Sequence, residues 1–308
     1  MTSRPVVSVV MGVFNGEEKV RASVQSILSQ EGVDLEFIIV DDGSTDNTPR
    51  ILEELESRDR RIRVIRQPNQ GLTIALIRGC SEAKGELIAR QDCGDLSLPG
   101  RLRAQVGVMK SHPDAALVST GTRFVGPAGE LLYEIIMGDQ SAAVDSIGTR
   151  LDQFRGPSCH PCTLFPRDLY QMVGGYRSEF YFAQDLDLWS RLIEHGNHLE
   201  ISYVMYEANF SPTGISAVYR ARQIELRQVI FECTRLRRSG VSEENALLKA
   251  RKVSPATAPP SPSERASALY FIGACLHNRH DSRAAHYFRE ALRVYPLHLK
   301  SAIRLIVG

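Results

Sequence analysis

The chain has 308 residues, 43% of them hydrophobic and 24% charged, enough for one large α/β domain with a smaller appendage. Its net charge of +1 gives no reason to expect nucleic acid as a partner, and no apolar run reaches the roughly 18 residues that cross a bilayer. The chain does not open on a signal peptide and its six cysteines form no disulfide framework, so we expect a soluble, cytoplasmic protein.

The first 100 residues alternate between short apolar runs and amphipathic segments. The runs are rich in β-branched residues, as in strands that are buried on both faces of a parallel sheet. The segments between them have helical spacing, and Thr48 followed by Pro49 is a typical helix start. This alternation predicts an α/β fold with a Rossmann-like, mostly parallel sheet and flanking helices. We expect strands at 6–10, 37–40, 63–65 and 87–89, and helices at 20–28, 48–55 and 73–82.

Beyond residue 100 the pattern is less regular. A strand is expected to start near Leu117, and residues 185–193 have the spacing of an amphipathic helix. Residues 253–263 hold four prolines and no charge, which indicates a linker. We therefore divide the chain into an α/β domain (1–220), a basic helical extension (221–252), a proline-rich linker (253–263) and a small C-terminal helical segment (264–308).

The basic extension has an uneven charge balance. Between Val218 and Lys252 there are nine Lys or Arg residues and four Glu residues. A solvated helical surface explains such an excess. The alternative is peripheral contact with an anionic membrane at its inner face.

The C-terminal segment resembles one tetratricopeptide unit. Gly273, Ala284, Phe288, Ala291 and Pro296 fall near the small, aromatic and proline positions of that repeat. A single copy cannot bury its own apolar face and needs a neighbour. We expect a helical hairpin that either packs on the α/β domain or docks a protein partner.

Three pairs of aspartates lie where the ligands of such a sheet bind. Ligands sit beyond the carboxyl ends of the strands in an open parallel sheet. Carboxylates there cost desolvation free energy unless a cation or a hydrogen-bond donor meets them. The pairs are Asp41 and Asp42 after the second expected strand, Asp92 and Asp95 after the fourth, and Asp185 and Asp187 near the start of a helix.

In order and spacing these motifs resemble the inverting glycosyltransferases of family 2, a group with the GT-A fold. The resemblance covers about residues 5–195. Its segments are V-V-S-V-V-M-G-V-F-N at 6–15, I-V-D-D-G-S-T-D at 39–46, N-Q-G-L at 69–72, A-K-G-E-L-I-A-R-Q-D at 83–92, P-G-R-L at 99–102, H-P at 160–161, G-G-Y at 174–176 and Q-D-L-D-L-W at 184–189.

The resemblance implies a nucleotide-binding role for four of these residues. Phe14 stands where an aromatic ring packs against the nucleobase. Asp42 stands where a carboxylate accepts a hydrogen bond from the base edge. Asn15 and Asp41 belong to the same two matched segments and complete the expected nucleotide site.

It also implies metal-binding and catalytic roles. Asp92 and Asp95 match the acidic motif that holds Mg²⁺ or Mn²⁺ on the diphosphate, and Asp185 stands at the position of the general base. His160 and Asp187 are expected to contact or orient the acceptor.

The acidic motif departs from the pattern of the family. It usually reads Asp-x-Asp-Asp, and here Gly94 replaces the middle aspartate. Because glycine offers no oxygen ligand, we expect a weaker metal site, and we expect Gly94→Asp to tighten it.

The implied activity is that of an inverting glycosyltransferase of the hexosyltransferase type. It would move a sugar from a nucleoside-diphosphate donor, UDP-sugar first among them, to a hydroxyl of a glycan or lipid-linked acceptor in polysaccharide synthesis. The alternative is a non-catalytic protein that binds nucleotide sugars or acts as a scaffold, with a degraded metal motif. The presence of Asp42, Asp95 and Asp185 favours the enzyme.

Overall fold

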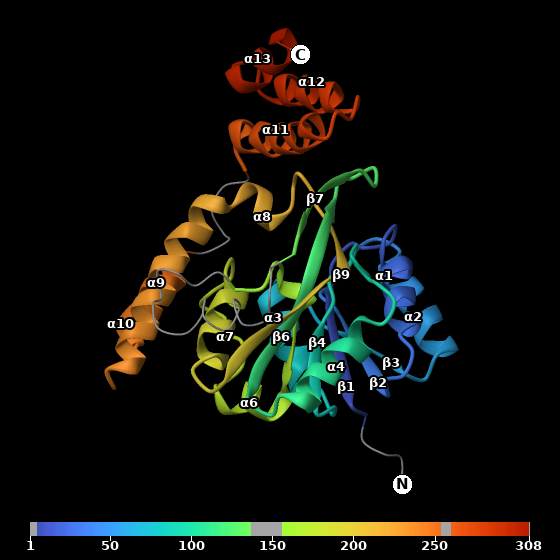
Figure 1. The fold of residues 1–308 in the computed structure, drawn as a ribbon, viewed down its shortest axis with the longest axis vertical. Helices are drawn as coiled ribbons and strands as arrows, with labels where there is room; N and C mark the ends of the chain where they lie inside the picture. Colours follow the sequence, from blue (N-terminus) through green and yellow to red (C-terminus); the bar gives the residue numbers. More distant parts are fainter. Residues whose placement is uncertain (1–4, 137–155, 254–259, 308) are drawn as a thin grey trace.

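The computed structural model describes residues 5–136, 156–253 and 260–307. A mixed sheet forms the centre of the molecule and carries helices on both faces (Figure 1). The last three helices, orange and red in Figure 1, lie beyond one end of this sheet. No helix in the described ranges is both long enough and apolar enough to cross a membrane.

The strands and helices expected in the first 100 residues are confirmed. Four parallel strands lie side by side in the order β3-β2-β1-β4, with Val7 of the central strand paired to Leu35 and Leu87. The elements are β1 (Val7–Val13), α1 (Val20–Leu28), β2 (Leu35–Asp41), α2 (Thr48–Arg58), β3 (Ile62–Arg66), α3 (Leu72–Ser81) and β4 (Leu87–Arg90).

Both faces of this parallel half are buried, which explains its continuous apolar runs. Along β1, Val9 and Met11 face one core with Ile27 of α1. The residue between them, Val10, faces the opposite core with Leu76 of α3. Alternate residues of one strand therefore fill two separate cores.

The other half of the sheet is mixed. The order continues β8-β6-β9-β5, and β7 pairs with β6. The long ladders are parallel and the antiparallel ones are short, so the predicted mostly parallel sheet is confirmed. The remaining elements of this half are β5 (Leu96–Ser97), α4 (Arg101–Ser111), β6 (Ala115–Val125), β7 (Leu131–Ile135), the 3₁₀ helix η2 (His160–Cys162), β8 (Leu164–Pro166), α6 (Arg167–Met172), α7 (Gln184–Leu192) and β9 (Asn197–Asn209).

The basic extension forms helices on the flank of the sheet. These are α8 (Ile215–Val218), α9 (Arg220–Arg238) and α10 (Glu244–Lys252). Leu226 and Ile230 of α9 are buried against Phe180 and Phe182, which precede α7. The extension is therefore packed on the α/β domain.

The C-terminal segment has one more helix than the hairpin we expected. It contains α11 (Pro262–Asn278), α12 (Ala284–Val294) and α13 (Leu299–Val307). Residues 254–259 of the expected linker lie outside the described residues, whereas its last two residues form the first turn of α11. There Ser261 and Glu264 make a reciprocal capping box, a strong signal for a helix start.

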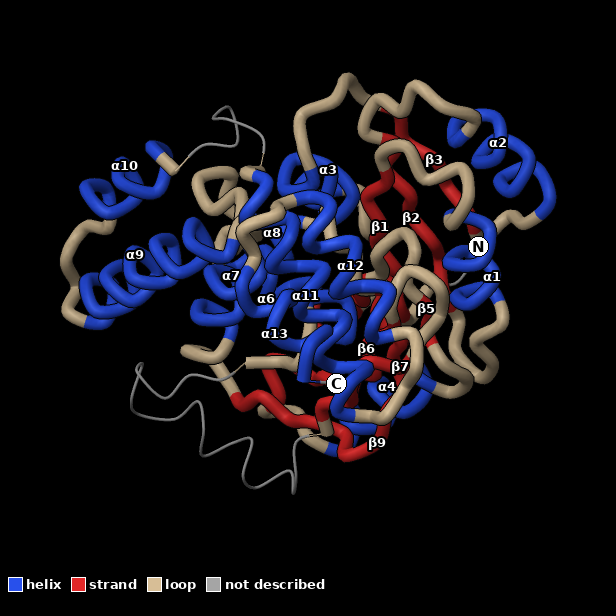
Figure 2. Tube along the Cα trace, turned by 90° about the horizontal axis from the view of Figure 1, so that it is seen from above, coloured by secondary structure: helices blue, strands red, loops and turns tan. Residues whose placement is uncertain are grey.

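The C-terminal helices pack on the β6–β7 hairpin, as Figure 2 shows from above. Leu132 of β7 lies in one apolar cluster with Ile272 and Leu276 of α11. The hydroxyl of Tyr287 donates a buried hydrogen bond of 2.5 Å to the carboxylate of Glu130. Apolar and polar contacts thus fix this unit against the sheet.

Candidate functional site

A cavity of about 620 Å³ lies where the chain leaves the carboxyl ends of β1 and β4. Segments far apart in the sequence meet in its wall, among them the loop after β4, η2, the first turn of α7 and the end of β9. Five of the predicted site residues line it: Phe14, Asp92, Asp95, His160 and Asp185. Four others, Asn15, Asp41, Asp42 and Asp187, do not line it.

The loop after β4 holds two carboxylates close together. Asp92 forms an ion pair with Arg90, whose guanidinium is fully buried and also donates to the carbonyl of Val10 at 3.1 Å. Asp95 is buried and accepts hydrogen bonds from the Tyr206 hydroxyl at 3.1 Å and from the backbone N–H of Asn209 at 2.8 Å. Burial and the neighbouring charge of Asp92 raise the pKa of Asp95 well above its usual range.

These two residues fit a divalent cation that takes its other ligands from phosphate and water. Mg²⁺ in nucleotide sites is usually held by one or two carboxylates and the substrate's phosphates. Burial is the main cause of the raised pKa of Asp95, and a bound cation would offset it. Within the described ranges no group of three or more His, Cys, Asp or Glu side chains forms a closed metal cage.

Gly94 has a conformation that an aspartate would adopt only with strain. Its φ is +103°, and its N–H donates to the Ser23 hydroxyl at 2.8 Å. A Cβ at this position would lie 3.1 Å from Cδ of Lys19. This backbone does not support the expected benefit of Gly94→Asp, because the new side chain would strain the segment that carries Asp92 and Asp95.

Asp42 does not line the cavity, and its contacts are with the chain between β3 and α3. Its carboxylate accepts hydrogen bonds from the Gln67 side chain at 2.7 Å, from the N–H of Gln70 at 2.9 Å and from the N–H of Gly71 at 2.7 Å. It therefore fixes the chain between β3 and α3. Any contact that it makes with a base adds to this positioning role.

Asn15 and Asp41 likewise shape the loops at the end of β1 and β2. Asn15 has φ of +50°, and its side-chain oxygen accepts from the N–H of Thr45 at 2.8 Å. Asp41 accepts from the N–H of Ser44, three residues further along the chain, at 3.0 Å. These contacts leave Phe14 half exposed at the mouth of the cavity.

Asp185 lies in the first turn of α7 and faces the cavity. Its carboxylate accepts one hydrogen bond of 2.8 Å, from the N–H of Leu186. Burial raises the pKa of Asp185, and the negative charge of Asp92 contributes in the same direction. A raised carboxyl pKa at a cavity is typical of an acid–base residue.

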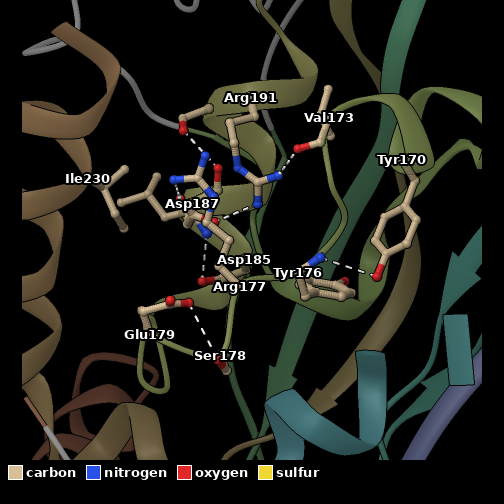
Figure 3. A network of polar contacts seen from close by, with 12 residues as sticks. Tyr170, Val173, Tyr176, Arg177, Ser178, Glu179, Asp185, Asp187, Arg191 and Ile230 are labelled. Atoms are coloured by element: carbon tan, nitrogen blue, oxygen red, sulfur yellow. Dashed lines mark hydrogen bonds and ion pairs between the residues drawn. The ribbon is translucent and has the colours of Figure 1, made fainter. Parts of the chain in front are cut away.

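Asp187 occupies a different environment, although it is only two residues away. Its carboxylate is buried and pairs with Arg191 at 2.6 Å and with Arg177 at 3.7 Å (Figure 3). Arg177 also pairs with Glu243 at 2.6 Å, so the network joins α7 to the extension. This placement does not support our expectation that Asp187 contacts or orients the acceptor, because the ion pairs hold its carboxylate away from the cavity.

His160 is buried beside the cavity as a neutral imidazole. Its Nε2 is 2.7 Å from the Tyr176 hydroxyl, and its ring meets that of Trp189 edge to face. Burial lowers the pKa of His160 well below its usual range, so the ring carries no charge near neutral pH. This geometry suits a hydrogen-bonding or orienting role and not a cationic one.

Two further polar groups of the cavity were not predicted. The indole N–H of Trp189 and the side-chain oxygen of Asn209 are buried and have no hydrogen-bond partner within the described residues. Buried polar atoms without a partner are uncommon and indicate a place for a ligand. The position of Trp189 at the end of the Q-D-L-D-L-W segment is a signal that could have identified it, whereas no sequence signal marks Asn209.

Comparisons with known proteins agree with this architecture. Residues 8–170 match the family model "Glycosyl transferase family 2". The chain is 36% identical over 200 residues to the putative glycosyltransferase EpsE of Bacillus subtilis, covering 64% of this chain and 69% of that protein. It is 29% identical over 189 residues to the O-antigen biosynthesis glycosyltransferase WbnJ of Escherichia coli, covering 61% and 72% of the two chains.

Solved structures share the fold at low sequence identity. TarS of S. aureus (residues 1–349) superposes with a TM-score of 0.58 and 15% identity over 96% of this chain and 87% of that chain. The mannosyltransferase PcManGT of Pyrobaculum calidifontis, in complex with GDP-Man and Mn²⁺, gives a TM-score of 0.57 and 16% identity over 98% and 83%. The matched family model covers more than half of the chain, and the chain therefore belongs to glycosyl transferase family 2, as a glycosyltransferase with the GT-A fold.

Proposed function

We propose that this glycosyltransferase moves a hexose from a nucleoside-diphosphate sugar to a hydroxyl of a glycan or lipid-linked acceptor, with inversion at the anomeric carbon. The observation that carries the proposal is the convergence of Asp92, Asp95 and Asp185 in one cavity whose mouth holds Phe14. A single displacement needs one group that binds the donor diphosphate and a second group that accepts the proton of the acceptor. The carboxylate pair Asp92 and Asp95 fits the first role, and the separate Asp185 fits the second.

In this reaction Asp185 removes the proton of the acceptor hydroxyl as its oxygen attacks the anomeric carbon. An alcohol is a poor nucleophile near neutral pH, and a positioned base overcomes this. Trp189 and Asn209 supply a donor and an acceptor for groups of the bound substrates. One displacement gives inversion without a covalent sugar–enzyme intermediate.

Asp92 and Asp95 are the residues that would hold Mn²⁺ or Mg²⁺. When bound, the cation neutralises the charge that develops on the leaving diphosphate. Arg90 places a buried positive charge next to Asp92 and orients that carboxylate.

UDP-sugars are the first donors to test. TarS has been solved in complex with UDP and with UDP-GlcNAc, and PcManGT with GDP-Man and Mn²⁺. A panel of UDP-, GDP- and dTDP-sugars, screened by thermal shift with and without Mn²⁺, would identify the donor, because a ligand that binds the native state raises its melting temperature. A chain that no nucleotide sugar stabilises would contradict the proposal.

The basic extension could contact an anionic membrane, where a lipid-linked acceptor would lie. Several cations of α9 and α10 are already paired: Arg237 with Glu194 and Glu243, Lys249 with Glu232, and Arg251 with Glu179. These pairs favour a solvated, internally balanced surface over an electrostatic membrane anchor.

We expect Asp42→Ala to weaken UDP binding by about 1.5–3 kcal/mol, the scale of hydrogen bonds to a charged group. The loss arises because the N–H groups of Gln70 and Gly71 no longer have their acceptor and the loop moves. Titration calorimetry measures the affinity, and Asp34→Ala, an exposed aspartate before β2, is the matched control. Unchanged UDP affinity in Asp42→Ala would remove Asp42 from the nucleotide site.

We expect Asp95→Asn to abolish the gain in UDP affinity that Mn²⁺ gives the wild type. The carboxamide keeps the shape but loses the charge that binds a hard cation. In the wild type this gain should fade as the pH falls through the raised pKa of Asp95, at a higher pH than for an ordinary aspartate of pKa about 3.9. Calorimetry with Mn²⁺ and with EDTA checks both points, and a full Mn²⁺ response in Asp95→Asn would show that the metal lies elsewhere.

A further inference from the structure

The cavity of the candidate site continues towards the C-terminal helices. A second cavity of about 650 Å³ shares Phe124, Tyr133, Phe210 and Ala217 with the first. A third, of about 490 Å³, shares Tyr133 and Phe271 with the second. Each lies within the roughly 300–1,000 Å³ typical of small-ligand sites. Together they form a groove, here called the α11 groove, that starts at the site of Asp185.

One face of α11 forms the wall of this groove. The residues of α11 that line the second and third cavities are three or four positions apart, so they form a single stripe along the helix. They are Glu264, Ser267, Phe271, Cys275 and Asn278. The adjacent face of α11 carries Ile272 and Leu276, which pack with Phe288 of α12 and with Leu132, and Cys275 lies at the border of the two faces. The other residues of the groove-facing stripe do not belong to this core cluster.

Aromatic rings from four separate segments meet in the α11 groove. The rings of Phe124 and Tyr133 stack with centroids 4.6 Å apart. Phe271 lies edge-on to Tyr133 at 5.9 Å and tilted against Phe210 at 5.1 Å. Phe271 remains 39% exposed, which is high for a phenylalanine in an aromatic cluster. The cluster therefore offers ring surface to a ligand.

The groove also carries polar side chains along the same path. Arg220 and Gln223 of α9 and Glu264 of α11 line the second cavity beside the rings. Gln223 already donates to the carbonyl of Phe182, and Glu264 already accepts from Ser261. An acyl or isoprenoid chain would desolvate the polar side chains without giving them any further hydrogen bond, at a cost in free energy. A sugar ring has an apolar C–H face that packs on an aromatic face and hydroxyls around its edge that reach polar neighbours.

We propose that the α11 groove binds the preceding sugar units of an oligosaccharide acceptor, with Phe271 as a stacking platform and the reacting hydroxyl in the cavity of Asp185. This inference rests on the proposed function, because it takes the first cavity as the place of sugar transfer. The C-terminal helices are then a part of the acceptor site. These helices are attached to the sheet by the packing of Leu132 and by the hydrogen bond from Tyr287 to Glu130. The two contacts fix the position of Phe271 relative to the first cavity.

The test measures binding of oligosaccharides to the full chain in the presence of UDP. Chitin-derived and hyaluronan-derived fragments of two to six sugar units serve as probes, and saturation-transfer NMR reports which sugar rings touch the protein. We expect affinity to rise with fragment length in the wild type. In Phe271→Ala we expect a loss of about three- to tenfold for the longer fragments, the scale of one aromatic contact, and little change for the disaccharides.

Two variants and one separate measurement make the result decisive. Phe271→Tyr keeps a ring and should restore the length dependence, whereas Tyr203→Ala, which removes a 73% exposed aromatic side chain outside the groove, should leave it unchanged. Wild-type affinity that does not grow with fragment length, an unaltered length dependence in Phe271→Ala, or tighter binding of a polyprenyl phosphate that competes with the fragments would overturn the inference. Affinity for the UDP-, GDP- and dTDP-sugars, measured on the same samples, separates the two failures. Absence of affinity for all of them contradicts the proposed function, and affinity for any of them together with one of these outcomes contradicts only the groove.

Discussion

Replacing Asp185 with asparagine is expected to lower the turnover of sugar transfer by at least about 100-fold, while UDP-sugar affinity stays within about threefold of the wild type. Asparagine keeps the shape of the side chain and the hydrogen bond from the N–H of Leu186. It cannot take up a proton. Because the base acts only on the acceptor hydroxyl, its loss affects the transition state and leaves donor binding nearly intact.

The pH profile gives a second readout for the same residue. Burial raises the pKa of Asp185, and a base works only when it is ionised. Turnover in the wild type should therefore fall as the pH drops through this raised pKa, at a pH above the value of about 3.9 for an exposed aspartate. In Asp185→Asn the residual turnover should no longer show this fall at low pH.

Asp168→Asn is the matched control, since that carboxylate is 84% exposed on α6 and lies outside the cavity. It should transfer sugar at the wild-type rate. Near-normal turnover in Asp185→Asn would contradict the assignment of the base. If Asp187→Asn were then inactive but folded, the assignment would move to Asp187.

The parallel half of the fold was predictable from sequence because its strands are buried on both faces. Residues 6–10 and 37–40 read as apolar runs inside β1 and β2, and the helix between them shows a clear apolar stripe. The other half was not predictable in the same way. In β9, for example, His198 and Glu200 are fully buried, and exposed positions alternate irregularly with buried ones. A strand that buries charged residue types does not give an apolar signal.

Most residues of the candidate site were also predictable, but not which of them face the cavity and which are held by contacts elsewhere. Strand ends brought Asp92 and Asp95 to the cavity, and the match to the family brought Asp185. Only the resemblance separated Asp185 from Asp187. The residue pattern alone does not, because the two differ only in which side of the first turn of α7 they occupy. It also gave no sign that Asp42 would be saturated by the loop at 67–71, since those contacts depend on the backbone of distant residues.

Replacing Asp187 with alanine should reduce the free energy of unfolding by about 3–5 kcal/mol, the usual result of removing one partner from a buried ion pair. Asp187 and Arg191 are both almost fully buried, and Arg177 lies 3.7 Å from the same carboxylate. The variant would leave the guanidinium of Arg191 without its buried counter-charge, whereas Arg177 would keep its pair with Glu243 (Figure 3). Urea unfolding and the melting temperature measure the change, and nucleotide affinity of the remaining folded protein should be normal.

The double variant Asp187→Leu with Arg191→Leu distinguishes an ion pair from a catalytic residue. Burial raises the pKa of Asp187 and lowers that of Arg191, so desolvation opposes the attraction between the two charges. Replacing both partners of a buried pair by apolar residues usually costs less stability than removing one. The double variant should therefore be more stable than Asp187→Ala, and the coupling between the two positions should appear in a double-mutant cycle. If the single variant Asp187→Ala had wild-type stability but no turnover, this carboxylate would act in the chemistry. Its ion pair with Arg191 would then not be the reason why an aspartate is needed at position 187.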